Sequence, residues 1–421
     1  LALVVADWAL ADAGVRTEET PAYDMGVATA SSSGGFEFGQ NELRALWSKG
    51  SQYVSAYQSF AWFYAVNTGQ ISIRNGMKGP GSVVVSDQAG GLDAVAQARR
   101  QVRKGIPMVL TGGIDASLCP WGWVAQMSAG RLSTTRDPAR AYLPFDAAAH
   151  GHVPGEGGAL LVVEDEEAAH RRGARSLGEI AGYGSTFDPA PDSGRPPTLR
   201  TAIEIALRDA GITADDVDAV FADGAGLPDL DRAEALALTE VFGAGGVPVT
   251  VPKTMTGRLH SGAAPLDLAG ALLAMRDGLI PPTVNVAPSP GLALDLVCET
   301  RPARLATVLV LARGHHGFNS AMVLRAPPNP TRRPMTQRHF TFDDLRIILR
   351  EAAGLEDDVL GDDALDAAFE DLGLESLALL ETGSRIEREY GITLDDSSLT
   401  GSKTPRALLE IVNGELATAA A

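Results

Sequence analysis

Cysteine, basic charge and long apolar runs are scarce in this 421-residue sequence. Its two cysteines, Cys119 and Cys298, are too few for a disulfide framework and lack metal-site spacing, so we predict no metal and a reducing, cytoplasmic environment. No apolar run approaches the roughly 20 residues that span a bilayer, and the N-terminus lacks signal-peptide features, so we expect neither membrane insertion nor export. The net charge of −18 argues against a nucleic-acid partner, because phosphate binding needs clustered Lys and Arg.

The negative charge is concentrated near the C-terminus. Residues 335–421 contain 19 Asp and Glu but only seven Lys and Arg, and so carry 12 of the 18 excess negative charges. The repeated prolines just before them forbid a continuing helix or strand. We therefore predict a large domain over residues 1–326, a Pro-rich linker over 327–334 and a separate acidic domain over 335–421.

Short apolar runs alternate with glycine-rich turns and amphipathic helices in the first of these parts. Examples of such runs lie at residues 82–87, 107–113, 157–165, 217–224 and 305–314. Their composition is typical of buried strands in a mostly parallel or mixed sheet, and they fall into two similar halves, the second beginning near Leu177. We predict an α/β domain with an internal duplication. Because the chain opens inside an amphipathic helix with no strand before it, we expect that an upstream segment is missing.

The acidic part is helical throughout. Its segments FDDLRIILREAAGL, SLALLETGSRIEREYG and TPRALLEIVNGELATA each carry apolar residues on one face. Thr404 as the N-cap and Pro405 at the first helical position form a strong helix start. We predict a small helical bundle.

A specific family resemblance is carried by five segments of the first part. They are SFAWFYAVNTGQISIRNGMKGP (59–80), VVVSDQAGGLDA (83–94), YLPFDAAAHGHVPGEGGALLVVED (142–165), VFADGAG (220–226) and VPKTMTGRLHSGAAPLD (251–267). In this order they resemble the thiolase-type condensing enzymes, and within them the chain-length factor, the ketosynthase beta subunit of type II aromatic polyketide synthases. The resemblance covers nearly all of residues 1–326. It implies a thiolase-like, duplicated, layered α/β fold whose N-terminal portion is missing here.

The same resemblance implies a condensing site without its catalytic residues. A condensing enzyme needs a thiolate at a strand-to-helix turn, and two histidines that assist decarboxylation and stabilise the developing oxyanion. This chain has Gln88 at the nucleophile position, Asp223 at the first histidine position and Arg258 at the second. We therefore predict no condensing activity of its own and a role as a subunit of an acyltransferase complex.

Alternative roles remain open for Gln88 and for three histidines. Gln88 could be a plain turn residue, or it could mark a malonyl-carrier decarboxylase that primes synthesis, although the loss of both histidines weakens this alternative. For His260, two residues past the second histidine position, we favour a structural role over a shifted catalytic one, because it has no nucleophile to serve. We assign no metal-binding role to His315 and His316, because adjacent side chains diverge in a strand and no third ligand is nearby in the sequence.

For a chain-length factor, the resemblance implies a heterodimer with a ketosynthase alpha subunit and a polyketide tunnel along their interface. The positions that close this tunnel correspond to Phe36, Gly39 and Leu43 in the segment SSSGGFEFGQNELRALW. Their spacing places them on one helical face, which without the resemblance would indicate only a core face. Because Gly39 and Leu43 are smaller than their counterparts in short-product members, we expect a product longer than an octaketide.

In the acidic part, DLGLESLALLETGSRIE resembles the acyl carrier protein signature. The resemblance spans residues 335–421 and implies a four-helix carrier bundle with 4′-phosphopantetheine attached covalently to Ser376, preceded by Glu375 where the family usually has aspartate. A serine at a helix start is by itself an N-cap, and a purely structural acidic bundle is the competing class. The implied partners are the ketosynthase alpha subunit, a malonyl-CoA:carrier acyltransferase, a phosphopantetheinyl transferase and downstream ketoreductase or cyclases.

Overall fold

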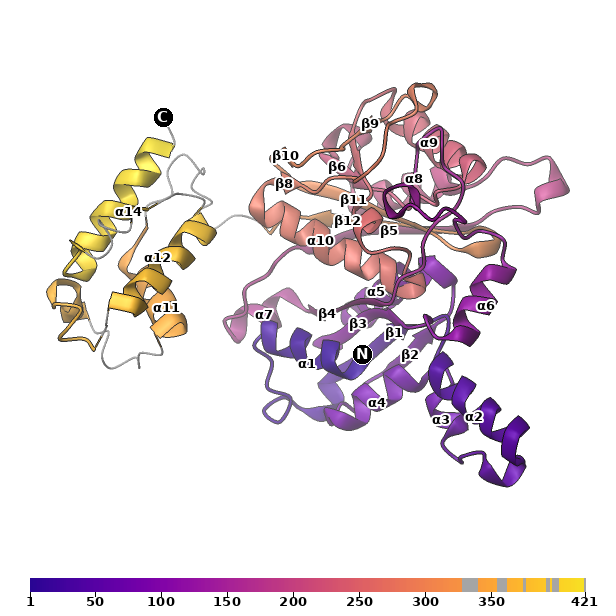
Figure 1. Cartoon of the computed structure of the whole chain (residues 1–421), viewed down its shortest axis with the longest axis horizontal. Coiled ribbons are helices and arrows are strands. Elements are labelled where there is room, and N and C mark those ends of the chain that lie inside the picture. The colour runs from indigo at the N-terminus through magenta and orange to yellow at the C-terminus, as the bar shows by residue number, and fades with distance from the viewer. Residues whose placement is uncertain (328–339, 354–361, 374–375, 391–393, 396–400, 420–421) are drawn as a thin grey trace. The chain divides into compact units, whose positions relative to one another are not determined.

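The chain forms two units, each with its own hydrophobic core (Figure 1). The first unit comprises Leu1–Pro327 and the second Pro328–Ala421. The computed structural model describes residues 1–327, 340–353, 362–373, 376–390, 394–395 and 401–419. Of the expected linker over 327–334, only Pro327 is among these residues. No described helix has both the length and the apolar composition needed to cross a membrane.

The first unit contains two main sheets, and the first of them has the strand order β2-β1-β3-β4. Strand β1 pairs in parallel with β2 and β3, and β3 pairs antiparallel with β4. The strands are β1 (Met25–Ala30), β2 (Gly81–Val84), β3 (Met108–Asp115) and β4 (Gly157–Glu164). Every residue of β1 and β3 is buried, as expected for strands covered on both faces.

The second sheet has the order β5-β12-β11-β6-β7-β9. Its strands are β5 (Glu179–Phe187), β6 (Ala219–Phe221), β7 (Pro248–Thr250), β9 (Asp295–Leu296), β11 (Thr307–Arg313) and β12 (Phe318–Arg325). Strands β8 (Leu279–Ile280) and β10 (Arg301–Pro302) form a separate pair. The run β7-β6-β11-β12 repeats the order and the strand directions of β2-β1-β3-β4, with a final antiparallel pair in both sheets. The predicted duplication is therefore visible in the topology.

Helices of the first unit form layers outside and between the two sheets (Figure 1). The outer face of the first sheet is covered by α1 (Ala2–Asp12) and α4 (Val66–Arg74), and that of the second by α8 (Leu199–Ala210) and α9 (Pro228–Phe242). Between the sheets lie α5 (Gly90–Arg103) and α10 (Ala263–Asp277). The remaining helices are α2 (Phe36–Lys49), α3 (Gln58–Ala61), α6 (Pro120–Ser128) and α7 (Glu166–Arg171).

The two central helices approach each other closely at the start of α5. A Cβ atom on Gly91 would lie 2.2 Å from Cδ of Pro265 and 2.4 Å from the carbonyl oxygen of Ser261, so this position cannot carry a side chain. The close approach places Gln88, two residues before α5, against the segment that leads into α10.

The second unit has helices at all three segments predicted from the sequence. They are α11 (Phe342–Ala353), α12 (Ser376–Tyr390) and α14 (Pro405–Ala419). Thr404 caps α14 as predicted, because its Oγ1 accepts a hydrogen bond from the backbone N–H of Ala407 at 3.3 Å. The core consists of Phe340, Leu345, Ile348, Leu349, Ala364, Phe369, Leu372, Leu379, Ile386, Leu394, Leu408 and Val412.

The separate cores predict separate unfolding of the two units. Leu349 is fully buried in the second core, so Leu349→Ala should lower the stability of the second unit by about 2–5 kcal/mol and leave the first unit unchanged. Calorimetry on the whole chain should show one shifted transition and one unshifted transition. Glu410→Ala, at an exposed position of α14, is the matched control and should shift neither. A shift of both transitions in Leu349→Ala would show that the units unfold together.

Candidate functional site

Gln88 lies at a sharp turn between a strand and a helix. It is the middle residue of a 3₁₀ turn, Asp87–Ala89, that joins the end of β2 to the start of α5. Asp87 has a φ of 53°, a left-handed conformation that is costly for a residue other than glycine. The side chain of Gln88 is 6% exposed, and its Oε1 has no hydrogen-bond partner among the residues described. The predicted turn is therefore present, with an amide at its tip.

Asp223 and Arg258 form a buried ion pair. Asp223 follows β6, and Arg258 follows the 3₁₀ turn after β7. Nη2 of Arg258 donates to both carboxylate oxygens of Asp223, at 3.1 and 2.9 Å, and Nη1 donates to the backbone carbonyls of Asp223 and Gly224, at 3.0 and 3.1 Å. Neither residue is more than 5% exposed. Both terminal nitrogens of the guanidinium are thus committed to one short segment.

The charge of this pair is stabilised within the protein interior. Burial alone would lower the pKa of Arg258, but the Asp223 carboxylate and the nearby hydroxyl of Tyr142 raise it above its ordinary value. Tyr142 itself donates a hydrogen bond to the carbonyl of Gly224 at 2.6 Å. Arg258 therefore stays charged, and its charge is compensated only where Asp223 is ionised.

A second buried carboxylate holds the backbone on which Asp223 lies. Glu234, on α9, accepts hydrogen bonds from the N–H groups of Asp223 and Gly224 at 2.7 and 2.9 Å. Burial, together with the charge of Asp223, raises the pKa of Glu234 from 4.5 to about 7. Its contribution to stability is therefore complete below about pH 4.5 and is lost as the pH rises through about 7.

His260 pairs with the aspartate that precedes Gln88. Its Nδ1 lies 3.2 Å from Oδ1 of Asp87, and the backbone N–H of His315 donates to Oδ2 of the same carboxylate at 2.7 Å. Burial would raise the pKa of Asp87, but the hydrogen bond and the charge of His260 hold it well below its ordinary value. One ring nitrogen of His260 is therefore committed to Asp87.

His315 and His316 lie in a turn between β11 and β12, not in a strand as the sequence analysis assumed. His316 has a φ of 68°, and the two rings meet edge-on with centroids 3.8 Å apart. The expectation that their side chains diverge is therefore wrong, because the left-handed residue turns the second ring back onto the first. Within the described part of the chain, no three His, Cys, Asp or Glu side chains are grouped so that they could hold a metal ion.

Phe36, Gly39 and Leu43 all lie on α2, with Gly39 buried and the other two half-buried. The ring of Phe36 meets that of Trp121 edge-on at 4.9 Å between centroids. A Cβ atom on Gly39 would lie 2.7 Å from Cδ1 of Trp62 and 2.8 Å from Cζ3 of Trp121. Gly39 is smaller than its counterparts, as noted from the sequence, but the two indoles occupy the room beside it within this chain. Of the three expected tunnel positions, Leu43 is then the one at which a smaller side chain can still leave extra room.

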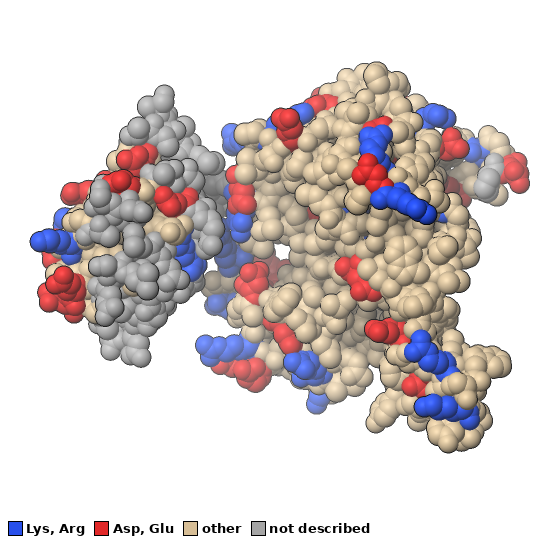
Figure 2. All heavy atoms as spheres, in the orientation of Figure 1, with Lys and Arg blue, Asp and Glu red and all other residues tan. Residues whose placement is uncertain are grey.

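The helices α2 and α3 project from the first unit (Figure 1). Together with the segment between and after them, they expose many large apolar side chains. We call residues 36–63 the aromatic hairpin, and its most exposed members are Trp47 (84%), Tyr57 (70%), Phe60 (62%) and Tyr53 (58%). Figure 2 shows Lys and Arg scattered among Asp and Glu on one face of this unit, with wide uncharged areas between them. An exposed apolar surface of this kind marks an interaction site.

Helix α6 extends the surface of the aromatic hairpin. It contacts α2, where the backbone N–H of Trp121 donates to Oε1 of Gln40 at 2.7 Å, and it exposes Val124 and Met127. This surface was not predicted from the sequence. A signal was present, because half of the twelve residues in YVSAYQSFAWFY, at 53–64, are aromatic.

Ser376 is the first residue of α12, in agreement with the prediction that it opens a helix. Its side chain, and all of Glu375, lie outside the described residues. A hydroxyl at the start of a 15-residue helix fits the attachment of phosphopantetheine, because the free N–H groups there favour an anionic phosphodiester. When bound, that group supplies the thiol on which acyl chains are carried.

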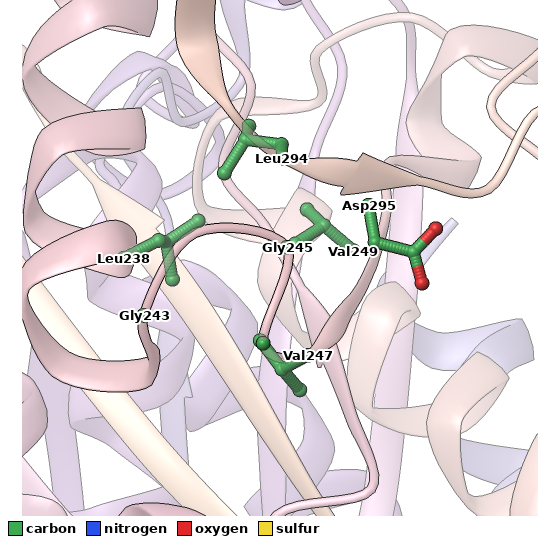
Figure 3. Close-up of a pocket in the computed structure, with 8 residues that line it drawn as sticks. Leu238, Gly243, Gly245, Val247, Val249, Leu294 and Asp295 are labelled. Atoms are coloured by element: carbon green, nitrogen blue, oxygen red, sulfur yellow. The ribbon is translucent and has the colours of Figure 1, made fainter.

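A hollow with an empty volume of about 160 Å³ lies beside the end of α9 (Figure 3). It is lined by Leu238, Gly243, Gly245, Gly246, Val247, Val249, Leu294 and Asp295. That volume includes open solvent, and the enclosed space does not admit a water molecule, whereas ligand pockets usually exceed about 300 Å³. Its one charged side chain, Asp295, is paired with Arg301 at 2.6 Å. The hollow therefore offers neither the space nor the free groups of a binding site.

Comparison with known proteins gives matches for both units. Residues 1–169 match the family described as beta-ketoacyl synthase, N-terminal domain, residues 177–287 match beta-ketoacyl synthase, C-terminal domain, and residues 343–412 match phosphopantetheine attachment site. The actinorhodin polyketide putative beta-ketoacyl synthase 2 of Streptomyces coelicolor is 60% identical over 328 residues, covering 77% of this chain and 81% of that protein.

Two further similarities agree with these matches. The tetracenomycin polyketide synthase ketoacyl synthase beta subunit of Streptomyces glaucescens is also 60% identical over 328 residues, covering 77% of this chain and 80% of that protein. Among solved structures, the ishigamide ketosynthase/chain length factor is similar with a TM-score of 0.71 and 26% identity, covering 77% of this chain and 81% of that one.

Because the ion pair is buried, we predict that removing only one of its charges strongly lowers the stability of the first unit. Asp223→Asn should destabilise the first unit by about 3–5 kcal/mol, because it leaves the buried guanidinium uncompensated. The double variant Asp223→Leu with Arg258→Met should recover most of this loss, since it removes both charges. Urea unfolding of each variant measures the effect. Asp229→Asn, which breaks an exposed pair with Arg232, should cost no more than about 1 kcal/mol. A double variant as unstable as the single one would contradict this account.

Proposed function

This chain belongs to the beta-ketoacyl synthase family, as a ketosynthase beta subunit or chain-length factor of type II polyketide synthases. On that basis we propose that its first unit pairs with an active ketosynthase. In this pair it sets the length of the polyketide and catalyses no condensation itself. The second unit is a phosphopantetheine carrier domain, which in this proposal holds malonyl and polyketide chains as thioesters. The chain thus brings a shaping subunit and a carrier together.

The ion pair at the two histidine positions is the observation that carries the non-catalytic role. Gln88 has no thiol to form a thioester, and the guanidinium of Arg258 is occupied by Asp223 and the adjacent backbone. His260 is held by Asp87. The site therefore lacks a nucleophile, and the guanidinium that replaces the second histidine is not free to stabilise a developing oxyanion.

One alternative is a malonyl-carrier decarboxylase that primes synthesis through Gln88. The buried Oε1 of Gln88, which has no partner among the described residues, is the observation that favours it. Decarboxylation leaves an enolate that needs hydrogen-bond donors, and the nearby donors of Arg258 are committed to Asp223. The geometry therefore supports the non-catalytic role more strongly.

Two surface features support pairing with a ketosynthase alpha subunit. The aromatic hairpin exposes apolar area that gains from burial, at roughly 25 cal/mol for each Å². Strand β2 is the last strand of its sheet, and the side away from β1 has no pairing strand in the described chain. Val85, just after β2, is also exposed. We propose that the aromatic hairpin and the β2 edge together form the heterodimer interface.

The tunnel positions lie on the helix that carries part of this interface. Leu43 and Trp47 are one turn apart on α2, so a polyketide running between the two subunits would reach Phe36 and Leu43 from the interface side. We propose that Phe36 and Leu43, with Gly39 and its two tryptophans, form the closed end. Because Leu43 is shorter than an aromatic stop, the product should still exceed an octaketide.

The carrier unit is proposed to bear 4′-phosphopantetheine on Ser376. Its acidic composition favours brief docking on basic partner surfaces, since long-range attraction raises encounter rates without tight binding. A phosphopantetheinyl transferase would load the unit, a malonyl-CoA:carrier acyltransferase would charge it, and a ketoreductase or cyclases would act on the finished chain.

The interface proposal predicts that one aromatic residue of the hairpin matters more than an equally exposed aromatic elsewhere. Phe60→Asp should weaken the heterodimer by about 30-fold or more, the effect of losing an interface anchor. Trp8→Asp, on α1 and exposed to 68%, should leave the affinity unchanged. Titration of the labelled chain with the ketosynthase partner measures both. Equal effects of the two variants would exclude the hairpin as the interface.

The tunnel proposal predicts a change in product length at Leu43. Leu43→Phe should shorten the product of the heterodimer, because a longer chain would overlap the ring at a cost of about 1–3 kcal/mol. Asn41→Phe places the same ring on an exposed position of the other face of α2 and should leave the length unchanged. The masses of the products of the reconstituted synthase give the chain length. An unchanged product length in Leu43→Phe would show that α2 does not set it.

The carrier proposal predicts loading at one serine of α12. Ser376→Ala should abolish the mass gain on incubation with coenzyme A and a phosphopantetheinyl transferase, while costing only about 1 kcal/mol for the lost cap. Ser384→Ala, at an exposed position of the same helix, should load normally. Intact-protein mass spectrometry gives the answer. Loading that persists in Ser376→Ala would place the attachment elsewhere.

A further inference from the structure

Asp115 is a buried carboxylate that ends β3 and is 2% exposed. Its Oδ1 accepts hydrogen bonds from Oγ of Ser31 at 2.8 Å, from the backbone N–H and Oγ of Ser33 at 3.1 and 2.9 Å, and from the backbone N–H of Ser32 at 3.0 Å. Its Oδ2 accepts from the N–H groups of Ser32 at 3.0 Å and of Ser261 at 2.9 Å. One carboxylate thus gathers donors from two segments.

The first of these segments is the root of α2. Residues 31–33 follow β1, and α2 begins at Phe36 only three residues later. The N-cap residue of α2 is Gly35, which offers no side-chain cap to fix the helix start. Hydrogen bonds to an ionised acceptor are roughly twice as strong as neutral ones, so the contacts with Asp115 are the strong polar restraint at this root.

The second segment belongs to the degenerate condensing site. Ser261 follows Arg258 and His260, its Oγ donates to the carbonyl of Asp87 at 3.0 Å, and it lies 2.6 Å from Oγ of Ser32. A continuous chain of hydrogen bonds therefore runs from the turn that holds Gln88, through Ser261 and Asp115, to the start of α2. The turn and the tunnel helix are joined at one residue.

We propose that Asp115 is a positioning residue for product length, fixing the root of α2 and thereby the place of Phe36, Gly39 and Leu43 at the tunnel end. This inference rests on the proposed measuring role of α2. A helix moves as a rigid rod from its root, so a small tilt at residues 31–33 displaces Leu43, which lies about two turns beyond the helix start at Phe36. The hydrogen bonds of Asp115 go to residues 31–33 and to Ser261 and not to the three tunnel residues, so Asp115 acts on them through the backbone.

The chemistry of the site requires a carboxylate. Asn at position 115 would replace one oxygen by an NH₂ group, which cannot accept. If Oδ2 is replaced, the bond from Ser261 and one of the two bonds from Ser32 are lost. If Oδ1 is replaced, the bonds from Ser31 and Ser33 and the other bond from Ser32 are lost. In either orientation the NH₂ group would face another N–H or O–H donor, and this unfavourable contact would weaken the attachment of the root of α2.

The test uses the full chain with Asp115→Asn, reconstituted with its ketosynthase partner and carrier. We expect the ratio of the main product to other chain lengths to fall by about two- to tenfold, the effect of losing one or so net hydrogen bonds. Hydrogen exchange at the amides of Ser32 and Ser33 should speed up in the same protein. Asp146→Asn is the matched control, because Asp146 is also buried and accepts from two backbone N–H groups, at 2.8 and 2.9 Å, outside this network.

Two further variants, Ser33→Ala and Leu43→Phe, distinguish the possible outcomes. If Asp115→Asn does not fold, Ser33→Ala, which removes one hydroxyl donor, should shift the ratio in the same direction by a smaller factor. A wild-type ratio in the folded variants, or an equal shift in Asp146→Asn, would overturn the positioning role. Leu43→Phe separates the two proposals: if it shifts length and Asp115→Asn does not, only this inference fails. If neither variant changes length, the measuring role of α2 fails, and this inference fails with it.

Discussion

The buried ion pair between Asp223 and Arg258 links the two halves of the degenerate site into one structure. Around it, the carboxylate of Glu234 accepts a hydrogen bond from the backbone N–H of Asp223. The backbone N–H of Arg313 donates to the carboxylate of Asp223 at 3.1 Å. Either charge alone would be left uncompensated in the protein interior, at a cost of several kcal/mol. The two replaced histidine positions therefore depend on each other, and the pair commits the guanidinium of Arg258 to Asp223 and the adjacent backbone.

The first unit combines a buried, degenerate condensing site with an exposed apolar surface. The centre has glutamine in place of the nucleophile, whereas the aromatic hairpin exposes large apolar side chains, which we propose a partner buries. Asp115 connects the two, because it binds both the loop of Ser261 and the root of α2. In this account the remnant of an active site serves as a rigid support for the helix that ends the tunnel.

Much of the architecture was predictable from the sequence, because buried strands and amphipathic helices leave periodic patterns. The strand β1 was missed because four of its six residues, in MGVATA, are Gly, Ala or Thr rather than large apolar residues. The pairing of Asp223 with Arg258 and the filling of the room beside Gly39 depend on tertiary contacts between distant segments. The turn at His316 depends on a left-handed residue that no periodicity indicates. The family resemblance located the degenerate positions but not their contacts.

The most direct test of the central claim compares the purified chain alone with the chain plus its ketosynthase partner, each given malonyl-loaded carrier. The account predicts polyketide only when both proteins are present, and no carbon dioxide release from the chain alone. Polyketide from the chain alone would contradict the non-catalytic role outright. Carbon dioxide release without polyketide, abolished by Gln88→Ala, would contradict it in favour of the decarboxylase.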